Sequence, residues 1–202
     1  MSGPKGELNH ALRQRLLEQR ILLLGGSLDD EVASELISEM LLLSSADPRA
    51  EIRLYINSPG GPAGAFLAIY DSMQSLSAPV PTICMSQSKG TAALLLAAGA
   101  PGKRLAFKNA LILVTFPEER LEGFDNIEAQ LEGARGRKQA VMKVALRHTG
   151  VDEERLATDL DRGVLLKAEE AKHYGIIDAV IDPGHPYFVR FPLPPLPGRN
   201  GE

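Results

Sequence analysis

The sequence contains only one cysteine, Cys84, so the chain cannot form a disulfide bond within itself. A single cysteine is typical of proteins that work in a reducing compartment such as the cytosol. No apolar run reaches the ~18 residues that a membrane-spanning helix needs, and no membrane association is expected. Residues 1–20 lack the apolar core of a signal peptide, so we expect no secretion signal.

An excess of charge of one sign is also lacking. The chain has 22 Lys and Arg residues against 26 Asp and Glu residues, which gives a net charge of −4. So weak an acidic balance predicts an ordinary solvated surface and gives no reason to expect a nucleic-acid partner. The glycine turns contain neither a G-x-G-x-x-G dinucleotide motif nor a GKS or GKT phosphate loop. We expect neither a cofactor nor a bound metal.

The sequence does have the length and the pattern of one α/β domain. At 202 residues the chain can bury a full hydrophobic core. Short apolar runs alternate with helical segments, which predicts an α/β fold of stacked parallel βαβ units. Strands are predicted at residues 20–26, 51–58, 81–86, twice within 103–116, and at 176–182. Helices are predicted at residues 27–43, 59–76, 91–99, 126–150, 152–160 and 167–175.

The chain is expected to divide into three parts. Residues 1–19 are predicted to form an arm and a first helix, and residues 20–182 the α/β domain. Residues 183–202 form a proline-rich tail that we expect to be irregular. The long helix near the middle of the chain is expected to end at Gly150, because glycine commonly follows the last residue of a helix.

Two polar turns follow predicted strands and are candidates for a binding site. They are "NSPGGPAG", residues 57–64, and "SQSKGT", residues 86–91. Ligands of open α/β sheets bind beyond the ends of the strands. Consecutive glycines let the backbone approach a ligand, and two converging N–H groups can form an oxyanion hole. The alternative is that each turn is only a tight connection between a strand and a helix.

Six blocks of the sequence resemble the ClpP family, the proteolytic subunits of ATP-dependent Clp proteases. In order they read "INSPGG", "AIYDSMQSL", "PTICM", "LLLAAGAPGKR", "HTG" and "AEEAKHYGIIDAVI", and the resemblance covers about residues 12–181. It implies the ClpP/crotonase fold, with a protruding handle at about residues 118–150. It also implies heptameric rings stacked in pairs, an AAA+ unfoldase as partner, and a location in the cytoplasm, or in the plastid stroma of a eukaryote.

The same resemblance locates the positions of the family's catalytic triad. Counting back from the "GKR" block assigns the nucleophile position to Gly90, and the matching patterns assign the histidine to Thr115 and the aspartate to Gly163. Glycine carries no nucleophile, and threonine cannot act as a base near neutral pH. The chain is therefore expected to be inactive as a peptidase, like the ClpR subunits. Gly61 and Thr91 match the positions of the oxyanion-hole N–H groups.

Other residues near these turns are candidates for substitute chemistry. Ser88 and Lys89 precede the vacated position, and a serine–lysine pair can be catalytic when the lysine is desolvated. We expect Ser88 to face away from the nucleophile position. The histidines are interpreted as surface or helix-capping residues; they are His10, His148, His173 and His185.

The resemblance also assigns contact residues. Asp161 and Arg162 match a pair that joins one ring to the other, although an exposed ion pair of little energy is the alternative. Arg53 and Tyr55 match the region where the unfoldase docks, and an arginine there makes an apolar pocket less hospitable. The segment 118–125 is charged and poor in glycine, so strand pairing with a substrate is doubtful there.

Three functions are therefore compared. The first is an inactive subunit that forms or joins Clp rings and modulates or protects the active protease. The second is a crotonase-like enzyme that reuses the oxyanion hole on thioester enolates without a serine nucleophile. The third is an active peptidase with a shifted alignment, in which Ser88 or Thr91 is the nucleophile.

Overall fold

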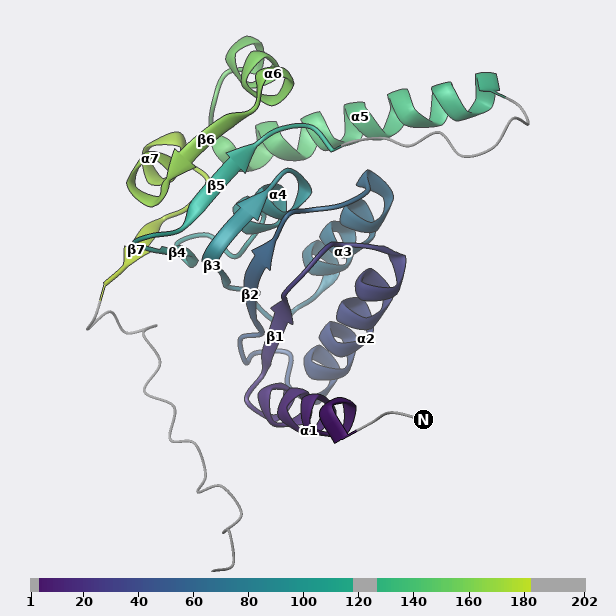
Figure 1. Ribbon diagram of the computed structural model, residues 1–202, viewed down its shortest axis with the longest axis vertical. Helices are drawn as coiled ribbons and strands as arrows, with labels where there is room; N and C mark the ends of the chain where they lie inside the picture. Colours follow the sequence, from purple (N-terminus) through teal and green to yellow (C-terminus); the bar gives the residue numbers. More distant parts are fainter. Residues whose placement is uncertain (1–3, 118–126, 183–202) are drawn as a thin grey trace, which may run out of the picture.

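The computed structural model describes residues 4–117 and 127–182, which form seven strands and seven helices (Figure 1). The strands are β1 Ile21–Leu24, β2 Arg53–Ser58, β3 Thr82–Lys89, β4 Arg104–Phe107, β5 Leu111–Val114, β6 Val164–Lys167 and β7 Ala179–Ile181. The helices are α1 Pro4–Glu18, α2 Asp30–Ala46, α3 Ala63–Ser75, α4 Thr91–Ala97, α5 Ile127–Thr149, α6 Glu153–Arg162 and α7 Ala168–Tyr174.

The strands form one sheet in the order β1-β2-β3-β4-β7, with β5 paired to β3 and β6 paired to β5. All pairings are parallel except that of β5 with β6, which is antiparallel. The first half of β3 pairs with β4, from Thr82 to Cys84, and its second half pairs with β5, from Gln87 to Lys89. The strand β3 therefore pairs with β4 along its first half and with the β5–β6 pair along its second half.

The prediction of an α/β fold is confirmed, with one strand added. Each predicted strand and helix occurs, and the cap of α2 is Asp29, whose side chain accepts a hydrogen bond from the N–H of Val32 at 2.8 Å. The sequence reading missed β6, because its four residues lie between two helices and follow a glycine. The strands that were predicted pair in parallel with one another, and the added β6 runs antiparallel to β5.

Side chains of the sheet alternate between two apolar clusters. Leu54 and Ile56 of β2 point into the main core, whereas Tyr55 between them belongs to a smaller cluster on the opposite face. This alternation follows from the two-residue repeat of a strand. Helices α2 to α7 all contribute buried side chains to the main core, whereas Leu16 of α1 packs against the smaller cluster. The main core is therefore the larger of the two.

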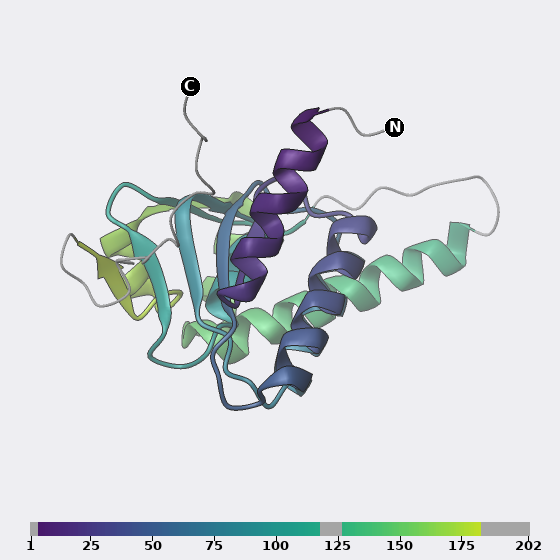
Figure 2. The ribbon, with the colours of Figure 1, turned by 90° about the horizontal axis from the view of Figure 1, so that it is seen from below.

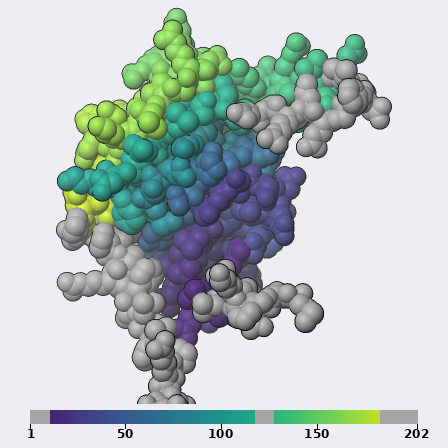
Figure 3. All heavy atoms as spheres, in the orientation of Figure 1, coloured from purple at the N-terminus to yellow at the C-terminus, as the bar shows by residue number. Residues whose placement is uncertain are grey.

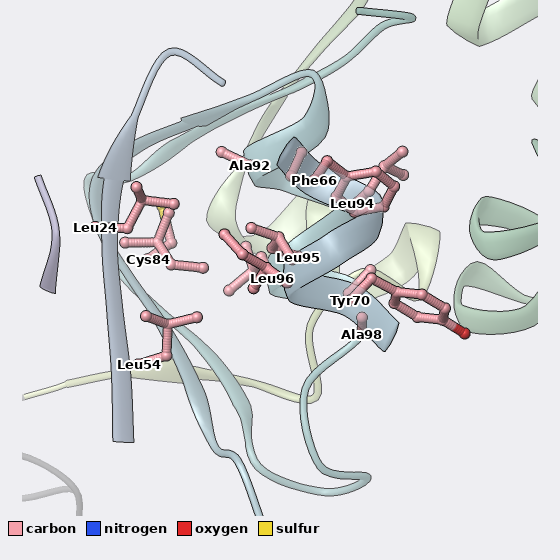
Figure 4. Close-up of a cluster of buried hydrophobic side chains, with 14 of the residues drawn as sticks. Leu24, Leu54, Phe66, Tyr70, Cys84, Ala92, Leu94, Leu95, Leu96 and Ala98 are labelled. Atoms are coloured by element: carbon pink, nitrogen blue, oxygen red, sulfur yellow. The ribbon is translucent and has the colours of Figure 1, made fainter. Parts of the chain in front are cut away.

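Helix α4 is buried along its whole length, as a helix must be when it is apolar on every side. Leu95 and Leu96 extend from it toward Leu24, Leu54 and Cys84 on the strands (Figure 4). All five side chains are fully buried. The helix that begins at the candidate turn is therefore held rigidly against the sheet.

Arg104 at the start of β4 joins the ends of three helices. Its guanidinium Nη1 donates to the carbonyls of Ala97, His148 and Gly175, which end α4, α5 and α7, at 3.2, 2.8 and 2.9 Å. Its Nε and Nη2 bind both carboxylate oxygens of Asp178, at 3.1 and 2.6 Å. A cation at the carboxyl end of a helix is favourable for the helix dipole. The "GKR" block thus has a structural role.

Helix α5 extends beyond the sheet in both ribbon views (Figures 1 and 2). In the space-filling view, α1 and α2 lie at one end of the body and α6 and α7 at the other (Figure 3). The tail predicted at 183–202 and the handle segment 118–126 lie outside the described residues. The predicted domain boundaries stay predictions. Within residues 4–117 and 127–182, the helices are too short or too polar to cross a bilayer.

Candidate functional site

The turn after β3 has the backbone of a nucleophile elbow. Gly90 has φ 53° and ψ −121°, a conformation that L-residues rarely adopt. Its N–H donates to the carbonyl of Leu113 at 2.9 Å, and its own carbonyl accepts the first helical hydrogen bond of α4, from Leu94. A sharp, strained turn from strand to helix is the position at which hydrolases hold a serine. Here a glycine occupies it.

Thr115 lies directly beside this turn because β3 and β5 are parallel and end at the same edge. The register aligns Lys89 with Leu113, two residues before Thr115. A Cβ atom built on Gly90 would lie 3.7 Å from the methyl carbon of Thr115. The Thr115 hydroxyl donates to the carbonyl of Leu160 in α6 at 3.3 Å, so it is directed toward that helix.

Gly163 completes the group from the opposite direction. It follows α6 and precedes β6, whose Val164 is paired with Val114 of β5. A Cβ atom built on Gly163 would lie 3.8 Å from the hydroxyl oxygen of Thr115. The antiparallel β6, which the sequence reading missed, is what brings residue 163 to residue 115.

The three positions assigned to the triad therefore converge in space. They are separated by 25 and 48 residues along the chain, since they are numbered 90, 115 and 163. Together they present two glycines and one threonine. The two glycines carry no functional side chain, and the threonine hydroxyl can neither accept a proton near neutral pH nor orient an imidazole. The structure brings the three positions together, and their assignment to a catalytic triad stays a prediction.

The second glycine turn lies against the start of α4. A Cβ atom on Gly61 would lie 1.8 Å from the carbonyl oxygen of Leu28, so only glycine fits there. The N–H of Gly61 donates to the Thr91 hydroxyl at 2.9 Å, and that hydroxyl donates to the carbonyl of Gly61 at 3.0 Å. The N–H of Gly60 donates to the hydroxyl of Ser58. Both turn amides are thus bonded to hydroxyl groups of the protein itself.

Ser88 and Lys89 lie on opposite sides of β3, because successive residues of a strand alternate. The Ser88 hydroxyl is fully buried, and the structure gives it no hydrogen-bond partner within residues 4–117 and 127–182. Lys89 is only half-buried. The two side chains therefore do not face one another as a catalytic pair would.

The residues expected at the ring–ring contact lie at the end of α6. Asp161 forms an ion pair with Lys138 of α5 at 3.1 Å, and both side chains are more than half exposed. Lys138 also lies over the ring of Phe116, 4.2 Å from its centre. An exposed ion pair of this kind contributes little to stability. It links α5 and α6 within the chain.

The residues expected at the unfoldase-docking region lie on β2. Tyr55 is buried in the smaller apolar cluster with Ile83 and Leu105, and burial raises the pKa of its hydroxyl while the charge of Arg53 opposes the shift. Arg53 donates to the carbonyl of Gln19 at 3.1 Å. Its guanidinium therefore fastens the end of α1 to the sheet.

The histidines lie apart from the three converging positions or outside the described side chains. His148 lies near the end of α5, 3.1 Å from the Tyr70 hydroxyl, and burial, with help from Arg104 and Arg147, lowers its pKa. It lines a cavity of about 250 Å³ at the start of β3. His173 is exposed and bonds the carbonyl of Glu169. The side chain of His10 and all of His185 are not described.

The described residues, 4–117 and 127–182, contain no group of three His, Cys, Asp or Glu side chains that could hold a metal ion. Burial raises the pKa of the Cys84 thiol to about 12, so this thiol is not a nucleophile near neutral pH.

Comparison with known proteins decides the family. A family model described as "Clp protease" matches residues 4–184. The chain belongs to the Clp protease family. It is 42% identical over 171 residues to "ATP-dependent Clp protease proteolytic subunit 1" of Mycolicibacterium paratuberculosis, which covers 83% of this chain and 81% of the relative.

Two further relatives agree with this assignment. Subunit 3 of Nocardia farcinica and subunit 2 of Mycobacterium bovis, with the same protein description, are each 42% identical over 171 residues. Each match covers 83% of this chain. It covers 77% of the Nocardia subunit and 80% of the Mycobacterium bovis subunit. The expected family and the ClpP/crotonase fold are confirmed. The roles assigned to single residues stay predictions.

The sequence reading missed the part played by the Thr91 side chain. It assigned only the backbone N–H of Thr91 to the oxyanion hole, whereas the structure shows the hydroxyl bonded to both polar backbone groups of Gly61. A hydroxyl residue at the first position of a helix, where a side chain can bond to backbone groups, was the available signal.

Proposed function

We propose that this chain is a catalytically inactive Clp subunit that forms or joins heptameric rings and modulates or protects the active protease. The observation that carries this proposal is the convergence of residues 90, 115 and 163 without a nucleophile, a base or an orienting carboxylate. With the serine, histidine and aspartate all missing from this group, the triad route to acyl transfer is closed. The role belongs in the cytoplasm, with an active ClpP paralogue and an AAA+ unfoldase as partners.

Retention of the fold supports the ring-forming half of the proposal. The matched region covers residues 4–184, and the turn at Gly90 keeps its elbow backbone although it holds no serine. Folding alone does not require the strained elbow backbone at Gly90. A chain that must fit among similar subunits would need the shape without the chemistry.

The second candidate, a crotonase-like enzyme, is favoured by the retained glycine turn. Such an enzyme needs free N–H groups at the oxyanion hole and an acid or base beside it. The N–H of Gly61 is already bonded to Thr91, and Lys89 is the only candidate base that the sequence offers. The third candidate, an active peptidase, would need Ser88 or Thr91 as nucleophile, yet both side chains are fully buried.

Two measurements test the proposal. Native mass spectrometry of the tagged chain, purified from its own cells, should find a mixed ring with an active ClpP subunit or a ring of this chain alone. The chain by itself should hydrolyse neither a peptide nor an acyl ester. Turnover that persists through purification and disappears in the Ser88→Ala or Thr91→Ala variant would refute inactivity. A strictly monomeric chain would refute ring membership.

A further inference from the structure

The Thr91 hydroxyl fills the turn that precedes α3. Thr91 is fully buried, and its hydroxyl oxygen lies 2.9 Å from the N and 3.0 Å from the O of Gly61. A Cβ atom built on Gly60 would lie 3.0 Å from the same oxygen. One side chain thus satisfies both polar groups of a single backbone residue and occupies the space beside its neighbour.

This contact conflicts with the use of the turn as an oxyanion hole. A donor of such a hole must aim its N–H at the developing oxyanion, about 2.7–3.1 Å away. The N–H of Gly61 has one proton, and that proton is directed at Thr91. The rigid attachment of α4 to the sheet holds the threonine in position, because every residue of this helix is buried.

We propose that the Thr91 hydroxyl locks the Gly61 N–H and so closes the former oxyanion hole to any carbonyl ligand. The inference rests on the proposed function and gives inactivity a second cause, which is independent of the side chains at residues 90, 115 and 163. It applies equally to peptides and to thioesters. Restoring a nucleophile alone would leave the electrostatic part of catalysis missing.

The test compares two variants that differ in one hydroxyl group. Thr91→Ser keeps the hydroxyl, and Thr91→Ala removes it. Exchange of the Gly61 amide is followed in the whole chain by hydrogen–deuterium exchange with residue resolution. We expect this amide to exchange roughly fivefold faster in Thr91→Ala than in Thr91→Ser, which is the factor that loss of one hydrogen bond of about 1 kcal/mol produces. The amide of Phe66, bonded to the carbonyl of Pro62, should be unchanged.

A matched control separates the lock from general loosening. Thr82 is also fully buried, and its hydroxyl bonds the carbonyl of Leu96 at 2.7 Å. Thr82→Ala removes a comparable hydrogen bond elsewhere in the core and should leave the Gly61 amide protected. Thr91→Val, which keeps the shape of threonine, serves as a second variant without the hydroxyl.

Equal exchange of the Gly61 amide in Thr91→Ser and Thr91→Ala would overturn the lock. Faster exchange in Thr82→Ala as well would also overturn it, because the effect would then report stability alone. Failure of the proposed function would be seen in a different measurement, the hydrolysis of an ester. The unaltered chain would hydrolyse an ester, whatever the exchange rate of Gly61.

Discussion

Gly90 and Thr115 lie so close that a Cβ atom on the glycine would be 3.7 Å from the threonine methyl carbon. At that distance side chains at the two positions would be in van der Waals contact. The contact exists because two parallel strands, β3 and β5, end side by side. The proximity of residues 90 and 115 therefore results from the pairing of the two strands and does not depend on the side chains at these positions.

Replacing Gly90 should destabilise the chain although the site has room for a side chain. At φ 53° and ψ −121° a non-glycine residue is strained, so Gly90→Ala or Gly90→Ser should lower the free energy of unfolding by about 1–3 kcal/mol. Urea unfolding measures this change. Gly136 is the control, because nothing lies near its Cβ position in α5 and Gly136→Ala should stabilise by about 0.5–1 kcal/mol. A Gly90→Ala variant as stable as the parent would contradict the strain.

Restoring the three side chains should restore ester hydrolysis only in part. In Gly90→Ser/Thr115→His/Gly163→Asp we expect a rate roughly 10²-fold above that of the parent, since general acid–base assistance contributes about 10²–10⁴-fold. Adding Thr91→Ala should raise the rate further, because a freed oxyanion-hole donor is worth about 10²–10³-fold. A folded triple variant without any gain would contradict the assignment of these positions.

Arg104→Lys should destabilise the chain by roughly 2–4 kcal/mol, because lysine cannot bind the Asp178 carboxylate and several helix-end carbonyls together. Burial alone would raise the pKa of Asp178, but the hydrogen bonds from Arg104 outweigh it and the pKa is lowered. Chemical denaturation gives the change. Arg155→Lys, in which an exposed cation pairs with the partly buried Asp159, should fall within about 0.5 kcal/mol of the parent. Equal effects of the two substitutions would contradict the role of Arg104.

His148 should make the chain less stable in mild acid. Burial, then the charges of Arg104 and Arg147, lowers its pKa, so below pH 6.5 the unfolded chain binds a proton that the folded chain resists. Stability should therefore fall as pH drops from 7 toward 5, by at most about 1.4 kcal/mol per pH unit from this group. His148→Gln should flatten that slope, and the exposed His173→Gln should not. Identical slopes in both variants would exclude His148 as the cause.

Cys84 should resist alkylation in the folded chain. Its side chain is fully buried and burial raises its pKa to about 12, so iodoacetamide at pH 8 should label it only after unfolding in urea. Mass spectrometry counts the added groups, and Cys84→Ala supplies the blank. Rapid labelling of the native chain would show that the contact with α4 opens readily.

The sequence predicted the order of elements because glycine turns and apolar runs are local signals, whereas positions 90, 115 and 163 were assigned only through the resemblance to the ClpP family. It did not predict β6, which is too short for a periodic pattern and is defined by its pairing with β5. It also did not predict that the Thr91 hydroxyl bonds Gly61, since that contact joins residues 30 positions apart. Such contacts depend on how α4 and the glycine turn pack together, which no local pattern encodes.

The glycine at the elbow also shapes the mutational paths open to this chain. Under the proposed function, a single change to serine would introduce backbone strain and bring no catalysis, because Thr115 and Gly163 supply neither a base nor an orienting group. A variant with only one triad residue would then be less stable than the parent without being more active. Gly90 keeps the elbow backbone without this strain, so each single substitution toward a triad lowers stability before it adds activity.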